Sequence, residues 1–242
     1  MDVRFLVAGD TAVIVEFGDR VDRSLSTRVL RLAADVTEAN IPGVQEAVPT
    51  YRSLMILHDP LAIDTASLVE KLQRLLDARS QDAAPAKRWR IPACYAPDYA
   101  PDLAEVAQRT GLAQTEVVRL HTETVFYVYM LGFVPGFPYM GDLPAALELP
   151  RRVDPRIRVP AGSIAIAARQ TAVYPLESPG GWHLIGATPL RLFDVRAARP
   201  ALLSPGDEVR FDPIGTAEFQ EIRAAVEADA YAVPCETVSG AR

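Results

Sequence analysis

The chain has 242 residues, of which 49% are apolar and 23% are charged, and its formal net charge is -6. This length suits one large domain or two modest ones, and the acidic balance excludes a basic surface for a nucleic-acid backbone. The N-terminus lacks the layout of a signal peptide, and no apolar run approaches the roughly 18 residues that cross a bilayer. We therefore expect a cytoplasmic protein that binds neither nucleic acid nor membrane.

The first part of the chain predicts a small α+β domain over residues 1–84. Apolar residues alternate or cluster as in strands at 11–17, 44–48 and 52–58, and the last two suggest a hairpin. Apolar residues recur at helical spacing at 23–39 and 65–79, and Asp22 or Ser24 is the expected N-cap of the first helix. Strands followed by helices in this order are typical of an α+β sandwich.

The second part, residues 85–242, predicts a β-rich barrel. Residues 77–88 have little apolar periodicity and are expected to form a linker. Beyond them, 12 of the 20 prolines and 9 of the 14 glycines lie between Gly132 and Gly215, separating short strand-like runs. Helices are expected near 101–109, 113–121 and 218–228.

Several well-known site motifs are excluded by their residues. GWHLIGAT at 181–188 resembles a phosphate-binding loop, but Ala187 stands in place of the lysine and Pro189 discourages the following helix. His58, His121 and His183 are scattered, so we expect no metal site. Cys94 and Cys235 are expected to be free thiols.

Residues 131–144 read LGFVPGFPYMGDLP and combine turn-forming residues with aromatic ones. Barrel corners would explain the glycines and prolines, since glycine permits positive φ and proline fixes its own. They do not explain the accompanying aromatic residues, which are Phe133, Phe137, Tyr139, Tyr174 and Trp182. Exposed aromatic rings usually contact a core, a ligand or a partner.

The loops of the second domain resemble those of a known family of carboxyltransferase subdomain C/D type. The matching segments, in order, are GFVPGFPYMGDLP, PR at 150–151, PRIRVPAGSIAIA, QTAVYPLESPGGW and IGATPLRLFD. The family contains the B subunit of bacterial 5-oxoprolinase, also called allophanate hydrolase subunit 1, and Kip-type inhibitors of sporulation kinase. The resemblance implies an α+β N-terminal domain followed by a cyclophilin-like β-barrel domain.

The resemblance also implies partners and an activity. Such chains associate with a homologous barrel subunit, the C-type subunit of 5-oxoprolinase, and with a third, A-type subunit. The complex uses ATP to open the lactam 5-oxoproline to glutamate, although no complete ATP site is recognisable in this chain. The loop at 131–144 is then expected to line a small-molecule pocket at the barrel mouth, close to the partner.

Lactam opening requires donors to an anion and a group that moves protons. We predict that His121 transfers protons or anchors polar groups, although His121 could also be only a cation at a helix C-terminus. Gln170 and Thr171 offer an amide and a hydroxyl, and the Gly162 and Ser163 backbone could present N–H groups. The expected apolar wall and its turns comprise Phe133, Pro135, Gly136, Phe137 and Tyr139.

Three positions depart from the family pattern. Ala168 and Ala172 stand where glycine is common, and Ala187 stands where arginine is common. Membership alone leaves other functions open, because one fold supports several activities. The alternatives are an inhibitor of a sensor histidine kinase, a subunit of an allophanate or urea-type amide-processing complex, and a prolyl isomerase suggested only by the barrel.

Overall fold

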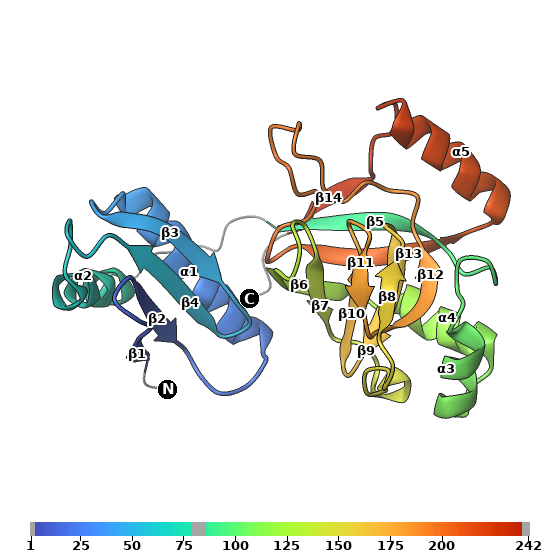
Figure 1. Ribbon diagram of the computed structural model, residues 1–242, viewed down its shortest axis with the longest axis horizontal. Helices are drawn as coiled ribbons and strands as arrows, with labels where there is room; N and C mark the ends of the chain where they lie inside the picture. The colour runs from blue at the N-terminus through green and yellow to red at the C-terminus, as the bar shows by residue number, and fades with distance from the viewer. Residues whose placement is uncertain (1–2, 79–85, 239–242) are drawn as a thin grey trace. The chain divides into compact units, whose positions relative to one another are not determined.

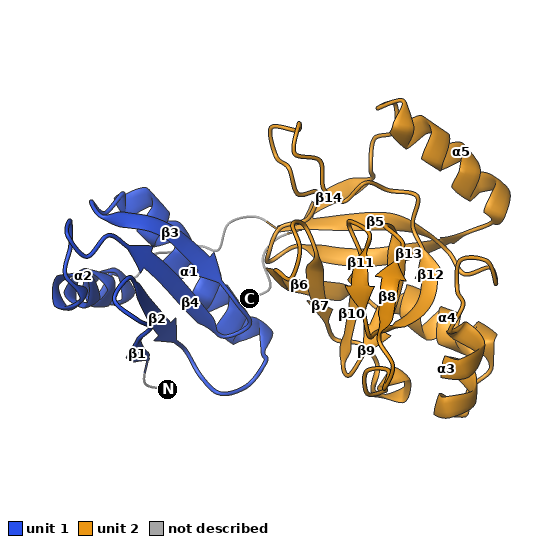
Figure 2. Ribbon diagram, in the orientation of Figure 1, with its two compact units in different colours: residues 1–85, 239–242 blue, residues 86–238 orange. Residues whose placement is uncertain are grey.

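The computed structural model describes residues 3–78 and 86–238, which lie in two compact units (Figure 1). One unit falls within residues 1–85 and the other within residues 86–238 (Figure 2). The predicted linker at 77–88 lies largely outside the described residues. Its last three residues belong to strand β5 (Ala86–Cys94), so that part of the linker prediction is wrong. The strand extends this far because Arg88 pairs with Glu208 on the neighbouring strand.

The first unit is an antiparallel sheet of four strands in the order β1-β2-β4-β3. The strands are β1 (Arg4–Val7), β2 (Ala12–Glu16), β3 (Val44–Pro49) and β4 (Ser53–His58). The pairing of β3 with β4 confirms the predicted hairpin. Strand β1 was not predicted, because three of its four residues are exposed and it shows no apolar alternation.

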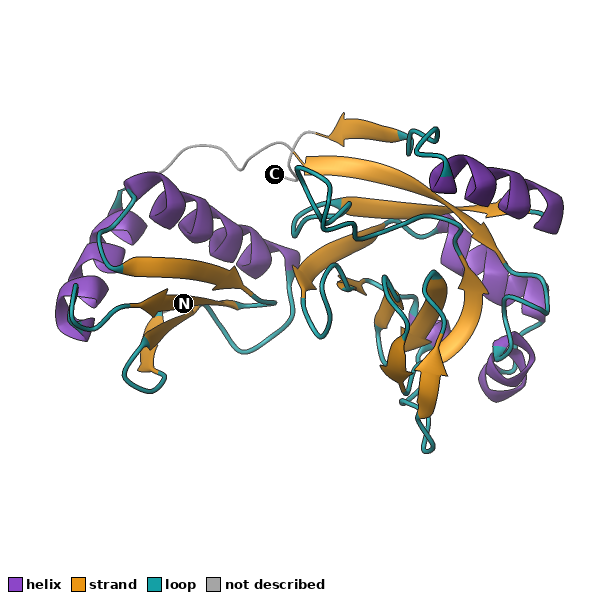
Figure 3. Ribbon diagram, turned by 45° about the horizontal axis from the view of Figure 1, so that its top comes forward, coloured by secondary structure: helices purple, strands orange, loops and turns teal. Residues whose placement is uncertain are grey.

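Two helices cover one face of this sheet, α1 (Arg23–Ala39) and α2 (Thr65–Asp77) (Figure 3). The side chain of Asp22 caps α1 by accepting a hydrogen bond of 2.8 Å from the Ser24 amide, which decides between the two expected caps. The apolar stripe of α1 packs against alternating residues of β2 and β4. This contact forms a core of its own, so the first unit has the predicted α+β architecture.

The second unit is a closed barrel. Its sheet has the order β12-β9-β10-β7-β6-β13-β5-β14, and β12 also pairs with β5, which closes the ring. Besides β5, the strands are β6 (Phe126–Leu131), β7 (Pro138–Gly141), β9 (Ser163–Ala167), β10 (Gln170–Val173), β12 (His183–Ala187), β13 (Glu208–Ile214) and β14 (Cys235–Val238). The predicted α+β domain followed by a β-barrel is confirmed.

Further elements decorate the barrel. A separate two-stranded sheet pairs β8 (Arg156–Val159) with β11 (Ser178–Gly180). The helices are α3 (Leu103–Thr110), α4 (Gln114–Glu123), the short η1 (Ala145–Leu147) and α5 (Thr216–Glu227). Helices α3, α4 and α5 lie within two or three residues of their predicted positions.

Residues of β9 and β10 alternate between two cores on opposite faces of the barrel wall. Ile164, Ile166 and Val173 belong to the main core, which also receives side chains from α3 and α4. Ala165, Ala167 and Ala172 belong to a second, smaller core. Because side chains of a strand point alternately to its two faces, neighbouring residues here face different environments.

Cys94 and Cys235 are both free, as expected. Among the described residues, no helix combines the length and hydrophobicity that crossing a bilayer requires.

The two alanines that replace glycine should respond oppositely to restoration of glycine. Ala168 has a φ of 50° in the turn between β9 and β10. Since this left-handed conformation costs an L-residue about 1–2 kcal/mol, Ala168→Gly should stabilise the second unit by about 0.5–1 kcal/mol. Ala172 is fully buried, so Ala172→Gly removes a packed methyl group and should destabilise the unit by about 1 kcal/mol.

Urea unfolding followed by tryptophan fluorescence measures both changes, because the chain's 2 tryptophans, Trp89 and Trp182, lie in the second unit. Destabilisation by Ala168→Gly would show that the turn imposes no strain on alanine.

Candidate functional site

The predicted loop between β6 and β7 forms a tight turn that is fixed by its own backbone. The amide of Gly132 donates to the Phe137 carbonyl at 3.1 Å, and the amide of Phe137 donates to the Val134 carbonyl at 3.1 Å. Phe133, at the tip, has a φ of 67°, and 58% of its surface is exposed. Non-glycine residues rarely adopt positive φ, and strained residues of this kind concentrate at functional sites.

Phe137 lies at the centre of a group of aromatic rings. The centroid of its ring lies 5.4 Å from that of Phe133, 5.0 Å from Tyr139, 5.1 Å from Tyr174 and 6.1 Å from Trp182. All four contacts have the edge-to-face geometry that aromatic pairs prefer. We call these five residues the aromatic cluster. The structure thus brings together all five aromatic residues that the sequence singled out.

The aromatic cluster is buried on one side and open on the other. Phe137, Tyr174 and Trp182 are buried, with Phe137 only 2% exposed, whereas Phe133 is exposed and Tyr139 is half-buried. Phe137 and the buried Gly136 therefore cannot contact a substrate directly, which corrects that part of the prediction. The groups that remain accessible to a ligand are Phe133, Tyr139 and the exposed Pro135 of the turn.

The two tyrosines of the cluster keep their hydroxyl protons at neutral pH. Burial raises the pKa of Tyr139 above its usual range, and the nearby charge of Arg151 only partly opposes this shift. Burial also raises the pKa of Tyr174, again against the charge of Arg151. Both phenols are therefore hydrogen-bond donors rather than anions.

His121 lies in a buried chain of hydrogen bonds on the main-core side. Its Nδ1 is 2.8 Å from the Tyr95 hydroxyl, and its Nε2 is 3.0 Å from the Thr171 hydroxyl. Thr171 donates its proton to the Ala165 carbonyl at 3.1 Å, so Nε2 of His121 must donate to Thr171. It follows that Nδ1 accepts the proton of Tyr95, and both ring nitrogens are satisfied.

The surroundings of His121 keep it neutral. Its ring is fully buried and stacks on Phe211 at a centroid distance of 4.6 Å, with Phe126 at 5.0 Å. Burial lowers the pKa of His121 to about 3. The interpretation of His121 as a cation at the helix C-terminus is therefore wrong. A group that transfers protons to a substrate must be accessible to that substrate, and the His121 ring is fully buried. Of the two predicted roles, the arrangement therefore favours polar anchoring over proton transfer.

The barrel wall separates the predicted catalytic residues from the aromatic cluster. Thr171 faces His121 and the main core, while its neighbours Gln170 and Ala172 lie on the opposite face, which carries the cluster. Gln170 is half-buried and lies next to the turn at Ala168. The side chains of His121, Gln170 and Thr171 therefore do not meet at one site.

The backbone amides of Gly162 and Ser163 are used within the fold. Gly162 donates to the Tyr174 carbonyl at 2.7 Å, and Ser163 donates to the Pro160 carbonyl at 3.2 Å. Both donors are therefore unavailable to a substrate, contrary to our expectation. Glycine is required at 162 because its φ is 84° and a Cβ there would overlap with the Thr188 carbonyl.

A buried ion-pair cluster, which the sequence did not reveal, attaches β8 to the barrel. The carboxylate of Asp102, only 3% exposed, accepts two hydrogen bonds from Arg156 at 2.9 and 2.6 Å and one from Arg152 at 3.2 Å. It also accepts a bond of 2.7 Å from the Leu184 amide of β12. The run of arginines at 151–158 was the available signal, but their partner lies about fifty residues earlier.

His183 is a buried strand residue. It is fully buried in β12, and its Nε2 lies 3.0 Å from the Pro150 carbonyl. GWHLIGAT therefore contributes to a strand and not to a loop before a helix. His58 is likewise buried, in β4 of the first unit. Within residues 3–78 and 86–238, no group of three or more acidic, histidine or cysteine side chains could hold a metal ion.

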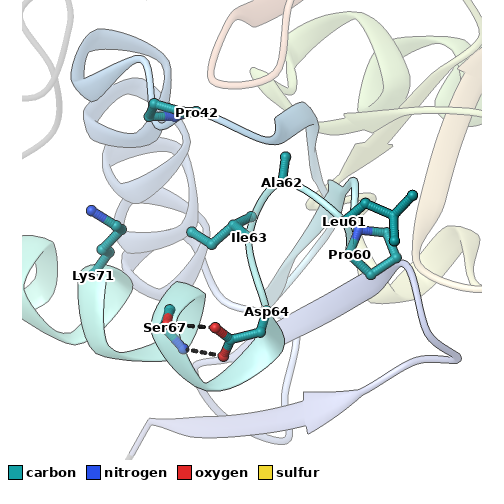
Figure 4. Close-up of a pocket in the computed structure, with 8 residues that line it drawn as sticks. All are labelled: Pro42, Pro60, Leu61, Ala62, Ile63, Asp64, Ser67 and Lys71. Carbon is teal, nitrogen blue, oxygen red and sulfur yellow. Dashed lines mark hydrogen bonds between the residues drawn. The ribbon is translucent and has the colours of Figure 1, made fainter.

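A hollow in the first unit contains none of the predicted site residues (Figure 4). Its polar side chains include Asp64, which accepts hydrogen bonds from the amide and the hydroxyl of Ser67 at 2.9 and 2.7 Å. These bonds cap α2, so they have a structural explanation. The aromatic cluster remains the candidate site.

Comparison with known proteins finds relatives that match most of the chain. The family model for the carboxyltransferase domain, subdomain C and D, matches residues 3–203. The chain is 45% identical over 214 residues to the 5-oxoprolinase B subunit of Escherichia coli O157:H7, covering 87% of this chain and 95% of that protein. It is 37% identical over 232 residues to the 5-oxoprolinase B subunit of Bacillus subtilis strain 168, covering 90% and 97%.

Among solved structures, the crystal structure of TTHA0988 is similar with a TM-score of 0.76 and 40% identity. The similarity covers 84% of this chain and 40% of that one, so this chain spans about two-fifths of TTHA0988.

The neutral state of His121 predicts how stability depends on pH. The unfolded histidine has a pKa near 6.5, whereas the folded one has a pKa of about 3, so between these values the unfolded state binds more protons. The free energy of unfolding should therefore be highest above pH 6.5 and fall as pH decreases toward 3, by up to ~1.4 kcal/mol per pH unit from this group.

Urea unfolding of wild type and His121→Gln between pH 7 and pH 4 tests this expectation, because glutamine does not titrate and the other groups cancel in the comparison. Equal pH slopes for the two proteins would contradict the assigned neutral state.

Proposed function

The chain belongs to the carboxyltransferase subdomain C and D family, and from this we propose that it is the B subunit of an ATP-dependent 5-oxoprolinase complex. The observation that carries the proposal is the 45% identity to a 5-oxoprolinase B subunit, of which the chain covers 95%. The reaction would open the lactam of 5-oxoproline to glutamate. An alignment of this length leaves little of the relative unmatched, which supports a role equivalent to that of the whole relative.

The difficulty of the reaction lies in the amide bond of the ring. Resonance makes the lactam carbonyl a poor electrophile. Phosphorylation of its oxygen at the expense of ATP would make the carbon reactive toward water; the ring would open when the C–N bond then breaks, and hydrolysis of the remaining bond to phosphate would leave glutamate, phosphate and ADP. What this chain can contribute is orientation, through an apolar surface. The exposed side of the aromatic cluster provides the surface, because Phe133 is exposed and Tyr139 is half-buried.

One segment of this chain, residues 181–188, resembles a phosphate-binding loop, but its structure does not fit the phosphates of ATP. Residues 181–188 contribute to β12, with Ala187 in place of a lysine, so their backbone amides belong to a sheet. We therefore assign nucleotide binding to the assembled complex. We draw no chemical step through ATP at this chain.

We further propose that a homologous barrel subunit and a third subunit complete the site. Two observations support partners. The aromatic cluster is buried on one side only, and exposed aromatic rings commonly meet a partner or ligand. In TTHA0988, the region similar to this chain makes up 40% of a longer polypeptide, so the same fold occurs joined to further sequence.

Reconstitution tests the proposed function. The chain should be co-expressed with the candidate partner subunits, purified as a complex, and assayed for glutamate release from 5-oxoproline with and without ATP. We expect ATP-dependent release by the complete complex and none by the isolated chain, because the chain holds only part of the site. A complex that is intact by size-exclusion chromatography but releases no glutamate would contradict the substrate.

A further inference from the structure

Arg151 is a charged side chain beside the aromatic cluster that has no carboxylate partner among the described residues. Its guanidinium carbon lies 5.9 Å from the centroid of the Trp182 ring, and its side chain is exposed. The other arginines of the adjoining loops pair with carboxylates, namely Arg152 and Arg156 with Asp102, Arg158 with Glu177 and Arg169 with Glu148. Arg151 therefore differs from its neighbours in being free to pair with an external anion.

We propose that Arg151 binds the carboxylate of a small ring-containing ligand whose apolar ring lies against the exposed side of the aromatic cluster. The inference rests on the proposed function, in which that ligand is 5-oxoproline. It adds Arg151, which the sequence analysis named only as part of the matching segment at 150–151, as a specificity-determining residue for the carboxylate.

The position of Arg151 is held by the fold rather than by a flexible loop. The next residue, Arg152, donates its amide to the Gly181 carbonyl at 2.7 Å and its side chain to Asp102 and Glu105. These contacts fix the chain on the C-terminal side of Arg151, next to the Trp182 backbone. A cation placed this way over an indole ring loses little entropy on binding an anion.

The charge of Arg151 complements a carboxylate. The Trp182 ring links it to the aromatic cluster, since the Arg151 guanidinium carbon lies 5.9 Å from the centroid of that ring and the Tyr139 centroid lies 6.1 Å from the same ring. Burial keeps the phenols of Tyr139 and Tyr174 protonated, so neither carries a negative charge that would repel an anion. The guanidinium can donate two parallel bonds to a carboxylate, while the CH2 groups of the lactam ring can pack against the exposed side of the aromatic cluster.

An ATP phosphate is also an anion and could be attracted to the same cation. The two ligands make different predictions. If Arg151 binds the substrate carboxylate, its removal weakens the binding of 5-oxoproline and leaves the binding of ATP unchanged. If Arg151 binds phosphate, its removal weakens the binding of ATP and leaves that of 5-oxoproline unchanged. Comparing ligands with and without a carboxylate also separates the two contributions of Arg151. Loss of its charge affects the binding of the carboxylate ligand alone, whereas loss of its packing affects the binding of both ligands.

The test uses the complete complex carrying Arg151→Ala or Arg151→Lys, with Arg158→Ala as the matched control. Arg158 is an exposed arginine of β8 whose partner is Glu177. We expect Arg151→Ala to raise the KM for 5-oxoproline about tenfold to a hundredfold, the usual effect of losing a charged hydrogen bond. Arg151→Lys should restore part of it, and Arg158→Ala should match wild type.

Inhibition by 2-pyrrolidinone, the same ring without its carboxylate, should be equal in wild type and Arg151→Ala. The inference is overturned if Arg151→Ala leaves the KM for 5-oxoproline unchanged, if it weakens 2-pyrrolidinone equally, or if the KM for ATP rises instead. A wild-type complex without turnover would contradict the proposed function separately. Calorimetric titration of the complex with 5-oxoproline and 2-pyrrolidinone then decides the inference, which fails if Arg151→Ala does not selectively weaken the carboxylate ligand.

Discussion

The two-residue repeat of strand β10 determines which parts of the second unit can act together. Thr171 points into the main core, where it accepts a hydrogen bond from His121, while Ala172 points to the second core beneath the aromatic cluster. A strand offers no other arrangement, because consecutive side chains alternate between its faces. Polar groups of the main core therefore support the wall, and it is on the opposite face that we propose contact with a ligand.

On the opposite face, the buried side of the aromatic cluster is held by the fold and the other side is exposed to solvent. The buried carboxylate of Asp102 ties Arg152 and Arg156 to the amide of β12, and this network holds β8 and the loop that carries Arg151. Removing one member of a buried ion pair is costly, since it leaves an uncompensated charge. The proposed site is thus a surface fixed in position on its buried side.

Sequence periodicity was sufficient to predict the helices and most strands, because the apolar residues that recur in the sequence form the faces that become buried. Phe133 and Tyr139 were also predictable, since aromatic residues beside turn residues need a partner. The availability of the Gly162 and Ser163 amides was not predictable, because it depends on carbonyls of Tyr174 and Pro160 that folding brings within reach. Asp102 was missed for the same reason: its partners are distant in sequence.

In the proposed complex, another subunit completes the open side of the aromatic cluster. Hydroxyl-radical footprinting of the isolated chain and of the purified complex, read by mass spectrometry, can detect this contact. We predict that Phe133, which is 58% exposed in the isolated chain, and Tyr139 lose reactivity on assembly, while Val195, 78% exposed elsewhere on the same unit, is unchanged. Equal reactivity of Phe133 and Tyr139 in the isolated chain and in an intact complex would contradict it.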